Sequence, residues 1–234
     1  MPSTLSRKID HTILKAEATE SEVRKIVAEA LQHRFASVCI NPRWLPLVRQ
    51  LLAEAQPGVP LADAVLACAC VGFPLGANKS TIKAAEAASC VKDGAQEIDM
   101  VISIPTLLAG NFDEARHDVM EVVRAARAVW PQIVVKVILE TAALIEEQIA
   151  LGCRAAREGG ADFVKTSTGF HPKGGATVQS VALLKKYSGG LRVKAAGGIR
   201  DHATALQMLE AGADRLGCSA SVAIILGEAS TATY

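Results

Sequence analysis

Three lysines recur in this chain at a spacing of 29 residues: Lys136, Lys165 and Lys194. Each follows a valine inside an apolar run, within IVVKVIL, ADFVKTS and LRVKAAG. Apolar strands that recur about 30 residues apart, with helices between them, form a parallel βα array. Lysine is rarely buried, so lysines on neighbouring strands of such an array indicate a polar interior and the chemistry of an amine.

Strand and helix candidates alternate along the whole chain. We expect strands ending near Asp10 and covering 37–40, 64–72, 97–102, 133–139, 162–166, 192–196 and 214–218. The expected helices cover 19–33, a segment starting at Pro42, 78–92, 112–129, 142–158, 176–187, 201–211 and 219–226. Right-handed crossovers close eight such units into an α/β fold, a single-domain TIM (β/α)8 barrel. An open doubly wound sheet is the alternative, but no GxGxxG motif follows the first strand.

Local signals support the same reading. Thr19 and Glu22 have the spacing of a capping box at a helix start. The segments DGAQEID, GGADFVK and AGADRLG each place a glycine between a helical pattern and a strand, as a left-handed helix end requires. No linker interrupts the pattern, so we expect one domain over residues 1–227 and a short polar tail over 228–234.

Composition narrows the functional classes. The net charge is +1, from 25 basic and 24 acidic residues, which favours neither nucleic acid nor a membrane surface as a partner. No apolar stretch reaches the ~18 residues of a membrane helix, and the N-terminus lacks an apolar signal segment. The six cysteines lack the spacing of a metal site with histidines, so we expect reduced thiols, no metal and a cytoplasmic location.

In a barrel of this kind, chemistry occurs at the carboxyl ends of the strands. An amine attacks a carbonyl only when neutral, and an apolar wall or a second cation favours the neutral form. Lys165 and Lys194 would lie on adjacent strands, and Asp99 in EIDMVI is a candidate acid/base. Taken singly, each lysine has a structural alternative, and we expect Lys136 to be structural, paired with Asp99 or Glu140.

A second signal concerns phosphate. AAGGIRD and LGCSAS are small-residue turns that follow the last two expected strands and open helices. Glycine turns at helix starts let backbone N–H groups approach an anion, and STGFHP adds Gly169 as a third wall. An amine nucleophile beside a phosphate site predicts a sugar-phosphate aldolase.

The segments IDHTILK, SVCINP, VGFPLG, EIDMVI, VKVILET, GADFVKTSTGF, VKAAGGIRD and RLGCS resemble the deoxyribose-phosphate aldolase family in order, over essentially the whole chain. The resemblance implies a metal-independent, class I TIM-barrel aldolase without a cofactor. Such an enzyme cleaves 2-deoxy-D-ribose 5-phosphate into D-glyceraldehyde 3-phosphate and acetaldehyde. The implied partners are these small molecules, and the implied state is a homodimer or a monomer.

The resemblance also implies roles for individual residues. Lys165 would form the Schiff base, Lys194 would be the second cation, and Asp99 would exchange protons with a water. The implied substrate-binding residues are Asp10, Thr12, Cys39, Thr166, Gly169, Gly197, Gly198, Gly217 and Ser219. Tyr234 is a possible assistant in proton transfer, because some relatives end in a tyrosine that reaches the site, and Lys136 is a further possible assistant.

Two positions depart from the family pattern: SIP at 103–105 replaces the more usual N-I-G, and Ala220 follows Ser219 where some relatives carry a second serine. Two other functions stay open at this point. One is a Schiff-base lyase or transaldolase with a different donor, against which the expected substrate wall argues. The other is a non-catalytic sugar-phosphate-binding barrel, which would have no need of paired buried lysines.

Overall fold

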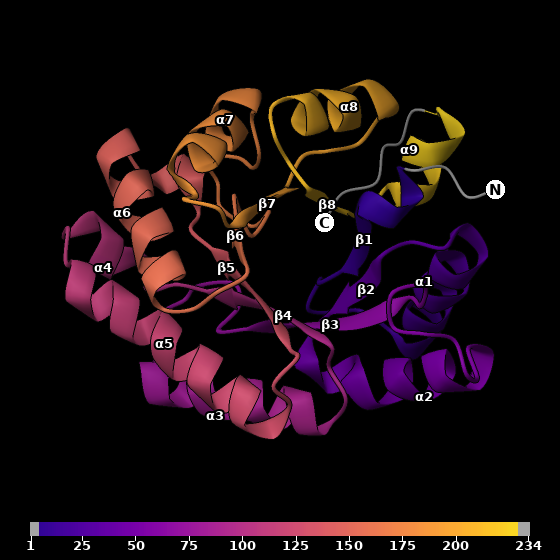
Figure 1. Ribbon diagram of the computed structural model, residues 1–234. Coiled ribbons are helices and arrows are strands. Elements are labelled where there is room, and N and C mark those ends of the chain that lie inside the picture. The colour runs from indigo at the N-terminus through magenta and orange to yellow at the C-terminus, as the bar shows by residue number, and fades with distance from the viewer. Residues whose placement is uncertain (1–4, 229–234) are drawn as a thin grey trace.

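Eight parallel strands pair in chain order and close into a barrel in the computed structural model, which describes residues 5–228 (Figure 1). The strands are β1 (Ile9–Ile13), β2 (Ser37–Ile40), β3 (Leu66–Val71), β4 (Glu97–Val101), β5 (Val134–Ile138), β6 (Phe163–Lys165), β7 (Arg192–Ala196) and β8 (Arg215–Cys218). Because β8 pairs with β1, the sheet has no open edge. The expected barrel is therefore confirmed, and the open doubly wound sheet is wrong.

Helices surround the barrel, with α3 and α5 side by side along one part of the ring (Figure 1). They are α1 (Glu20–His33), α2 (Leu45–Ala55), α3 (Ser80–Lys92), α4 (Ile104–Leu108), α5 (Phe112–Val129), α6 (Glu146–Glu158), α7 (Val178–Tyr187), α8 (His202–Glu210) and α9 (Ser221–Leu226). The short helix α4 was not expected from the sequence. It accommodates Pro105 in its first turn, where the missing N–H of proline costs nothing.

Strand β1 is longer than expected and extends three residues beyond Asp10, to Ile13. Asp10 and Thr12 therefore lie within the strand, and so does Asp99 at the centre of β4. The expectation that the first strand ends near Asp10 was wrong. Both carboxylates lie at the depth of the barrel interior, below its carboxyl-end mouth.

The apolar core lies between the strands and the helices. Outward-facing strand residues such as Val135 and Val137 pack there with helix residues such as Val119 and Val122. The inward positions of several strands carry charged residues instead of the branched aliphatic residues usual in such barrels. Burial of charge is costly, so the core outside the barrel supplies the stabilisation that the interior lacks.

The local signals at helix ends have the expected geometry. Thr19 and Glu22 form a capping box at the start of α1. Gly94, Gly160 and Gly212, which end helices, all have positive φ. None of the helices within residues 5–228 is long and apolar enough to cross a membrane.

Candidate active site

Lys165 and Lys194 are register partners on the adjacent strands β6 and β7. Both side chains point into the barrel and converge on the same atom. The Nζ of Lys165 and the Nζ of Lys194 each lie 2.7 Å from Oδ2 of Asp99 on β4. The spacing predicted that the lysines converge, and Lys165 and Lys194 meet at a carboxylate from a third strand.

Lys136 belongs to the same cluster. Its Nζ lies 2.9 Å from Oδ1 of Asp99 and 2.6 Å from Oε2 of Glu97. The predicted pairing with Asp99 is confirmed, and the alternative pairing with Glu140 is wrong. Glu140 instead accepts hydrogen bonds from the backbone N–H and hydroxyl of Thr168.

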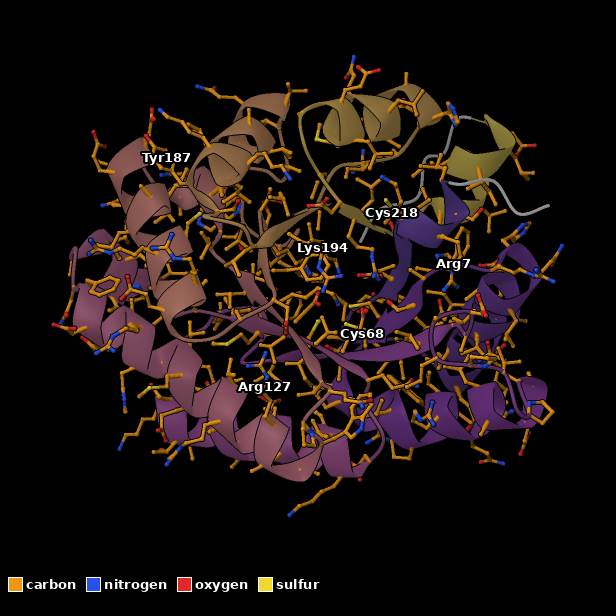
Figure 2. The ribbon with its side chains drawn as sticks, viewed as in Figure 1. Arg7, Cys68, Arg127, Tyr187, Lys194 and Cys218 are labelled. Carbon is orange, nitrogen blue, oxygen red and sulfur yellow. The ribbon has the colours of Figure 1, made fainter. Side chains whose placement is uncertain are left out.

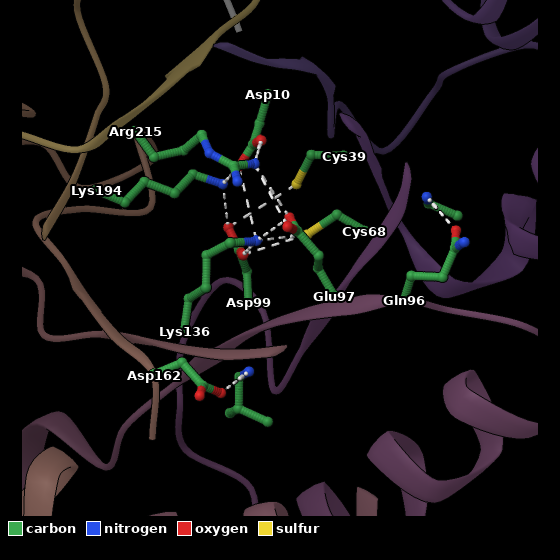
Figure 3. Close-up of polar contacts among 12 residues, drawn as sticks. Asp10, Cys39, Cys68, Gln96, Glu97, Asp99, Lys136, Asp162, Lys194 and Arg215 are labelled. Carbon is green, nitrogen blue, oxygen red and sulfur yellow. Dashed lines mark hydrogen bonds and ion pairs between the residues drawn. The ribbon is translucent and has the colours of Figure 1, made fainter. Parts of the chain in front are cut away.

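Asp10 and Arg215 close the network on the opposite side. Lys194 forms an ion pair with Oδ2 of Asp10, and Nη1 of Arg215 lies 2.6 Å from Oδ1 of Asp10. Arg215 also reaches Oε1 of Glu97, at 3.4 Å. Figure 3 shows these side chains meeting within the barrel, and Figure 2 places Lys194 at its centre.

Glu97 and Arg215 were missed in the sequence. Their signal was available, because side chains alternate along a strand and Glu97 shares the inward face with Asp99 two residues away. Arg215 is the register partner of Lys194, so it also faces inward. Both residues begin their strands, at the amino ends of β4 and β8, whereas chemistry was expected at the carboxyl ends.

The cluster has a definite charge pattern. Burial raises the pKa of Asp99, but Lys136, Lys165 and Lys194 outweigh it and hold that pKa well below its usual range. Burial lowers the pKa of Lys194, but Asp10 and Asp99 outweigh it and hold that pKa well above its usual range. In the resting site at neutral pH, Lys194 is therefore a cation and Asp99 an anion.

Accessibility separates the three lysines. Lys136 and Lys194 are 0 % exposed, whereas Lys165, the last residue of β6, is 3 % exposed. Of the three amines, Lys165 at the carboxyl end of β6 is thus the one with contact to solvent at the barrel mouth.

The loop after β6 is fixed above Lys165 by two buried side chains. Glu140 has a left-handed backbone (φ 61°), unusual for a residue other than glycine, and is 1 % exposed. Its carboxylate holds Thr168 of the loop. The hydroxyl of Thr166 donates to the carbonyl of Ala196 and accepts from its N–H, which ties β6 to β7.

At the barrel mouth, the loop after β7 touches the backbone of the loop after β6 at three glycines, Gly197 in the first and Gly169 and Gly175 in the second. A Cβ added to Gly197 would lie 2.9 Å from Cα of Gly175 and 3.2 Å from Cα of Gly169. Gly169, Gly197 and Gly198 all have positive φ, which favours glycine. This close approach explains why small residues follow β6 and β7, and it gives the geometry in which backbone N–H groups can meet an anion.

The other residues expected to bind substrate include Thr12, Gly217 and Ser219, and each has a different kind of contact. The Thr12 hydroxyl donates to the backbone carbonyl of Asp10. Gly217 lies within β8, where an added Cβ would meet Cε of Lys194 at 3.2 Å, so this glycine makes room for the lysine. Ser219 follows β8 directly and lines a pocket together with Thr12 and Lys15.

Cys39 lies in the barrel beside two cysteines that sequence reasoning had assigned no role. Cys39, Cys68 and Cys70 form a small buried cluster with Leu14, and Phe73 packs against it. The ring of Phe73 also meets that of Phe170 edge to face, with centroids 5.3 Å apart. Tyr234 lies outside the described residues.

Comparisons with known proteins agree with this geometry. The profile of the DeoC/LacD family aldolases matches residues 4–224. The chain is 47% identical over 231 residues to the deoxyribose-phosphate aldolase of Carboxydothermus hydrogenoformans, covering 98% of this chain and 97% of that protein. It is 48% identical over 224 residues to the deoxyribose-phosphate aldolase of Enterococcus faecalis, covering 95% and 96%.

A solved structure shares the fold closely. The deoxyribose phosphate aldolase of Aeropyrum pernix superposes with a TM-score of 0.86 at 32% identity, covering 97% of this chain and 91% of that chain. Its description names a tetramer. Profile, sequence and structure agree over nearly the full length, and the chain belongs to the DeoC/LacD aldolase family.

Proposed function

We propose that this protein is a class I aldolase that reversibly cleaves 2-deoxy-D-ribose 5-phosphate into D-glyceraldehyde 3-phosphate and acetaldehyde. One observation carries the proposal: the amine at the barrel mouth, Lys165, shares a carboxylate oxygen of Asp99 with the cation Lys194. An amine beside a second cation is the arrangement that favours a neutral, nucleophilic amine. The curated relatives above carry the name of the same activity.

The reaction begins at Lys165. Its neutral amine adds to the C1 aldehyde of the open-chain sugar, and loss of water leaves an iminium. Asp99 lies close enough to Lys165 to exchange protons there, directly or through one water. Lys194 is protonated in the resting site because Asp10 and Asp99 stabilise its charge.

The iminium then accepts the electron pair of the C2–C3 bond. The C3 hydroxyl loses its proton, C3 becomes the aldehyde of glyceraldehyde 3-phosphate, and an enamine remains on Lys165. The enamine takes a proton at carbon, and water hydrolyses the resulting iminium to acetaldehyde and the free amine. Asp99 and Lys194 are placed to move these protons, since both lie within hydrogen-bond distance of each other and Asp99 contacts Lys165.

The phosphate group is assigned to the glycine turns after β6 and β7. Gly169, Gly197 and Gly198 lie at the barrel mouth with positive φ, on the side of the barrel that carries Lys165 and Lys194. Backbone N–H groups without side chains around them suit a phosphate. Ser219, after β8, would add a hydroxyl donor.

We also propose that the protein is located in the cytoplasm. We further propose that it is a homodimer or a monomer. Sedimentation of the full chain tests the assembly directly, and a tetramer like that named for the Aeropyrum relative would contradict our expectation.

Turnover tests the function. The full chain, with a chelator present, should release acetaldehyde and glyceraldehyde 3-phosphate in equal amounts from 2-deoxyribose 5-phosphate. Lys165→Arg keeps the charge but removes the nucleophile, so it should abolish release. Lys173→Arg, on the loop beyond Phe170, is the matched control and should retain it. Absence of cleavage by the unaltered chain, or loss of cleavage on chelation, would contradict the proposal.

A further inference from the structure

Two thiols and a carboxylate converge inside the barrel. Cys39 on β2 and Cys68 on β3 are register partners, and their sulfur atoms and a carboxylate oxygen of Asp99 all lie within 4.8 Å of one another. Sγ of Cys68 lies 3.2 Å from Oδ1 of Asp99, and Sγ of Cys39 lies 4.0 Å from Oδ2. In Figure 3 both sulfur atoms point into the carboxylate cluster.

A third sulfur lies beside them. Sγ of Cys70 is 3.8 Å from Sγ of Cys39. A tetrahedral Zn²⁺ with Zn–S bonds of about 2.3 Å holds its two sulfurs roughly 3.8 Å apart. Cys39 and Cys70 therefore already have the separation of two zinc-bound sulfurs, and the sulfur of Cys68 lies within 4.8 Å of that of Cys39.

Nearby ammonium groups are the main objection to a cation here. The Nζ of Lys136 lies 3.4 Å from Sγ of Cys68. A cysteine thiol has an ordinary pKa of about 8.5, so it is mostly protonated at neutral pH. When Zn²⁺ binds, it displaces one proton from each of two thiols, and two positive charges enter as two protons leave. The charge inside the barrel is unchanged, which removes the objection.

We propose that Cys39, Cys68 and Asp99, with Cys70 adjacent, bind a thiophilic divalent cation such as Zn²⁺ or Cd²⁺, and that this cation inhibits the enzyme. The step is Zn²⁺ plus two thiols giving a zinc dithiolate and two protons, with no change of oxidation state. Asp99 supplies an oxygen ligand. A carboxylate engaged by the cation is no longer available to Lys165 and Lys194.

The inhibition rests on the proposed function, whereas binding of the cation does not. Cd²⁺ is therefore the probe for binding, since its thiolate complexes absorb in the ultraviolet through charge transfer. Titration of the reduced, metal-free full chain should give a band that saturates and that excess Zn²⁺ removes. A chain that binds Cd²⁺ but cleaves no sugar phosphate would refute the function and leave the site standing.

Substitutions locate the site. Even an outer-shell partner of a metal ligand is worth ~10–100-fold in affinity, so loss of a ligand should weaken binding by at least about that factor. Cys68→Ser and Cys68→Ala should both do so. Cys153→Ser, on α6 and outside the barrel, is the matched control, because Cys153 is equally buried.

Activity gives the second readout. Zn²⁺ should inhibit the unaltered chain and Cys153→Ser alike, and a chelator should restore both. For Cys68→Ala, inhibition is measured relative to the activity of the same variant without metal. The Zn²⁺ concentration that gives half-inhibition should rise by the same factor as the Cd²⁺ dissociation constant. Unchanged Cd²⁺ affinity in the Cys68 variants, equal weakening in Cys153→Ser, or no charge-transfer band would overturn the proposal.

Discussion

Lys165 and Lys194 face each other in register on adjacent strands, and their ammonium groups share one carboxylate oxygen of Asp99 at equal distances of 2.7 Å. The two lysines differ in what else holds them. Lys194 is fully buried and has a second carboxylate, Asp10, whereas Asp99 is the only ion-pair partner of Lys165 within residues 5–228. The shared oxygen therefore joins a buried cation to the amine at the barrel mouth.

That difference predicts the effect of Lys194→Leu. The substitution removes the positive charge beside Lys165, so the neutral amine is no longer favoured there. It also removes a group that can carry protons. Positioned proton transfer contributes ~10²–10⁴-fold to rates, so turnover should fall by at least about 10²-fold. Lys185→Leu, at an exposed position on α7, is the control. Full retained activity in a folded Lys194→Leu protein would refute the role of Lys194.

Gly197 predicts a separation of phosphate binding from chemistry. An added Cβ at Gly197 would press on the backbone of Gly175, so Gly197→Ala should displace the turn after β7. We expect KM for 2-deoxyribose 5-phosphate to rise at least about tenfold, a cost of ~1.4 kcal/mol. Cleavage of unphosphorylated 2-deoxyribose should change much less.

The control for Gly197→Ala is Gly174→Ala. Gly174 also has positive φ, but an added Cβ there meets no atom within 4 Å. It therefore reports the cost of backbone strain alone. Equal losses on the phosphorylated and unphosphorylated sugars would count against a phosphate site at Gly197.

A buried ion pair also lies outside the barrel. Lys83 on α3 pairs with Asp118 on α5, and its Nζ also donates to the carbonyls of Val101 and Gly76. Lys83→Met leaves Asp118 buried without its cation, which should lower the free energy of unfolding by ~3–5 kcal/mol in urea. Adding Asp118→Leu should recover much of that loss.

The control for Lys83 is the exposed pair of Lys186 and Glu146. Lys186→Met should leave the free energy of unfolding nearly unchanged, because water and salt screen exposed charges. If Lys83→Met is as mild as Lys186→Met, the buried pair does not join α3 to α5 as the geometry indicates.

The carboxylates of the barrel predict acid sensitivity. The pKa values of Asp10 and Asp99 are held well below their usual range, so these groups stay ionised in the folded protein. Unfolded aspartates bind protons near pH 3.9, so their contribution to stability is full well above that pH and is lost as the pH falls. With two such groups, the free energy of unfolding should fall by up to ~2.7 kcal/mol for each pH unit below about pH 3.9.

Urea unfolding between pH 5 and pH 3, a range set by the ~3.9 reference value, checks this slope. Asp10→Asn should lower it by ~1.4 kcal/mol per pH unit, the share of one proton. The exposed Asp113, whose side chain is 85% accessible, supplies the control Asp113→Asn. An unchanged slope in Asp10→Asn would show that Asp10 is not ionised in the folded barrel.

The strand spacing predicted the barrel because each βα unit has a nearly fixed length, and seven of the eight expected strands agree with the observed ones to within two residues. Strand β1 was placed short because its inward positions, Asp10 and Thr12, are polar and hide a buried strand. Helix α4 was missed because a five-residue segment containing Pro105 has too little periodicity to be recognised.

The site was predicted less completely than the fold. The convergence of Lys136, Lys165 and Lys194 follows from their spacing, because they lie on the successive strands β5, β6 and β7, whereas Asp99 meets them from β4. Glu97 and Arg215 were missed because chemistry was expected at the carboxyl ends of the strands, whereas these residues stand at the amino ends of β4 and β8. The cysteine cluster was missed for a different reason, since the contact of Cys39 with Cys70 depends on register and on side-chain direction.

The central claim is that Lys165 is the nucleophile, and borohydride trapping tests it most directly. The full chain is incubated with acetaldehyde, reduced with borohydride, digested, and mapped by peptide mass analysis. We predict a two-carbon adduct on Lys165, its loss in Lys165→Arg, and its persistence in Lys173→Arg. An adduct on Lys136 or Lys194 instead, or no adduct at all, would contradict the account.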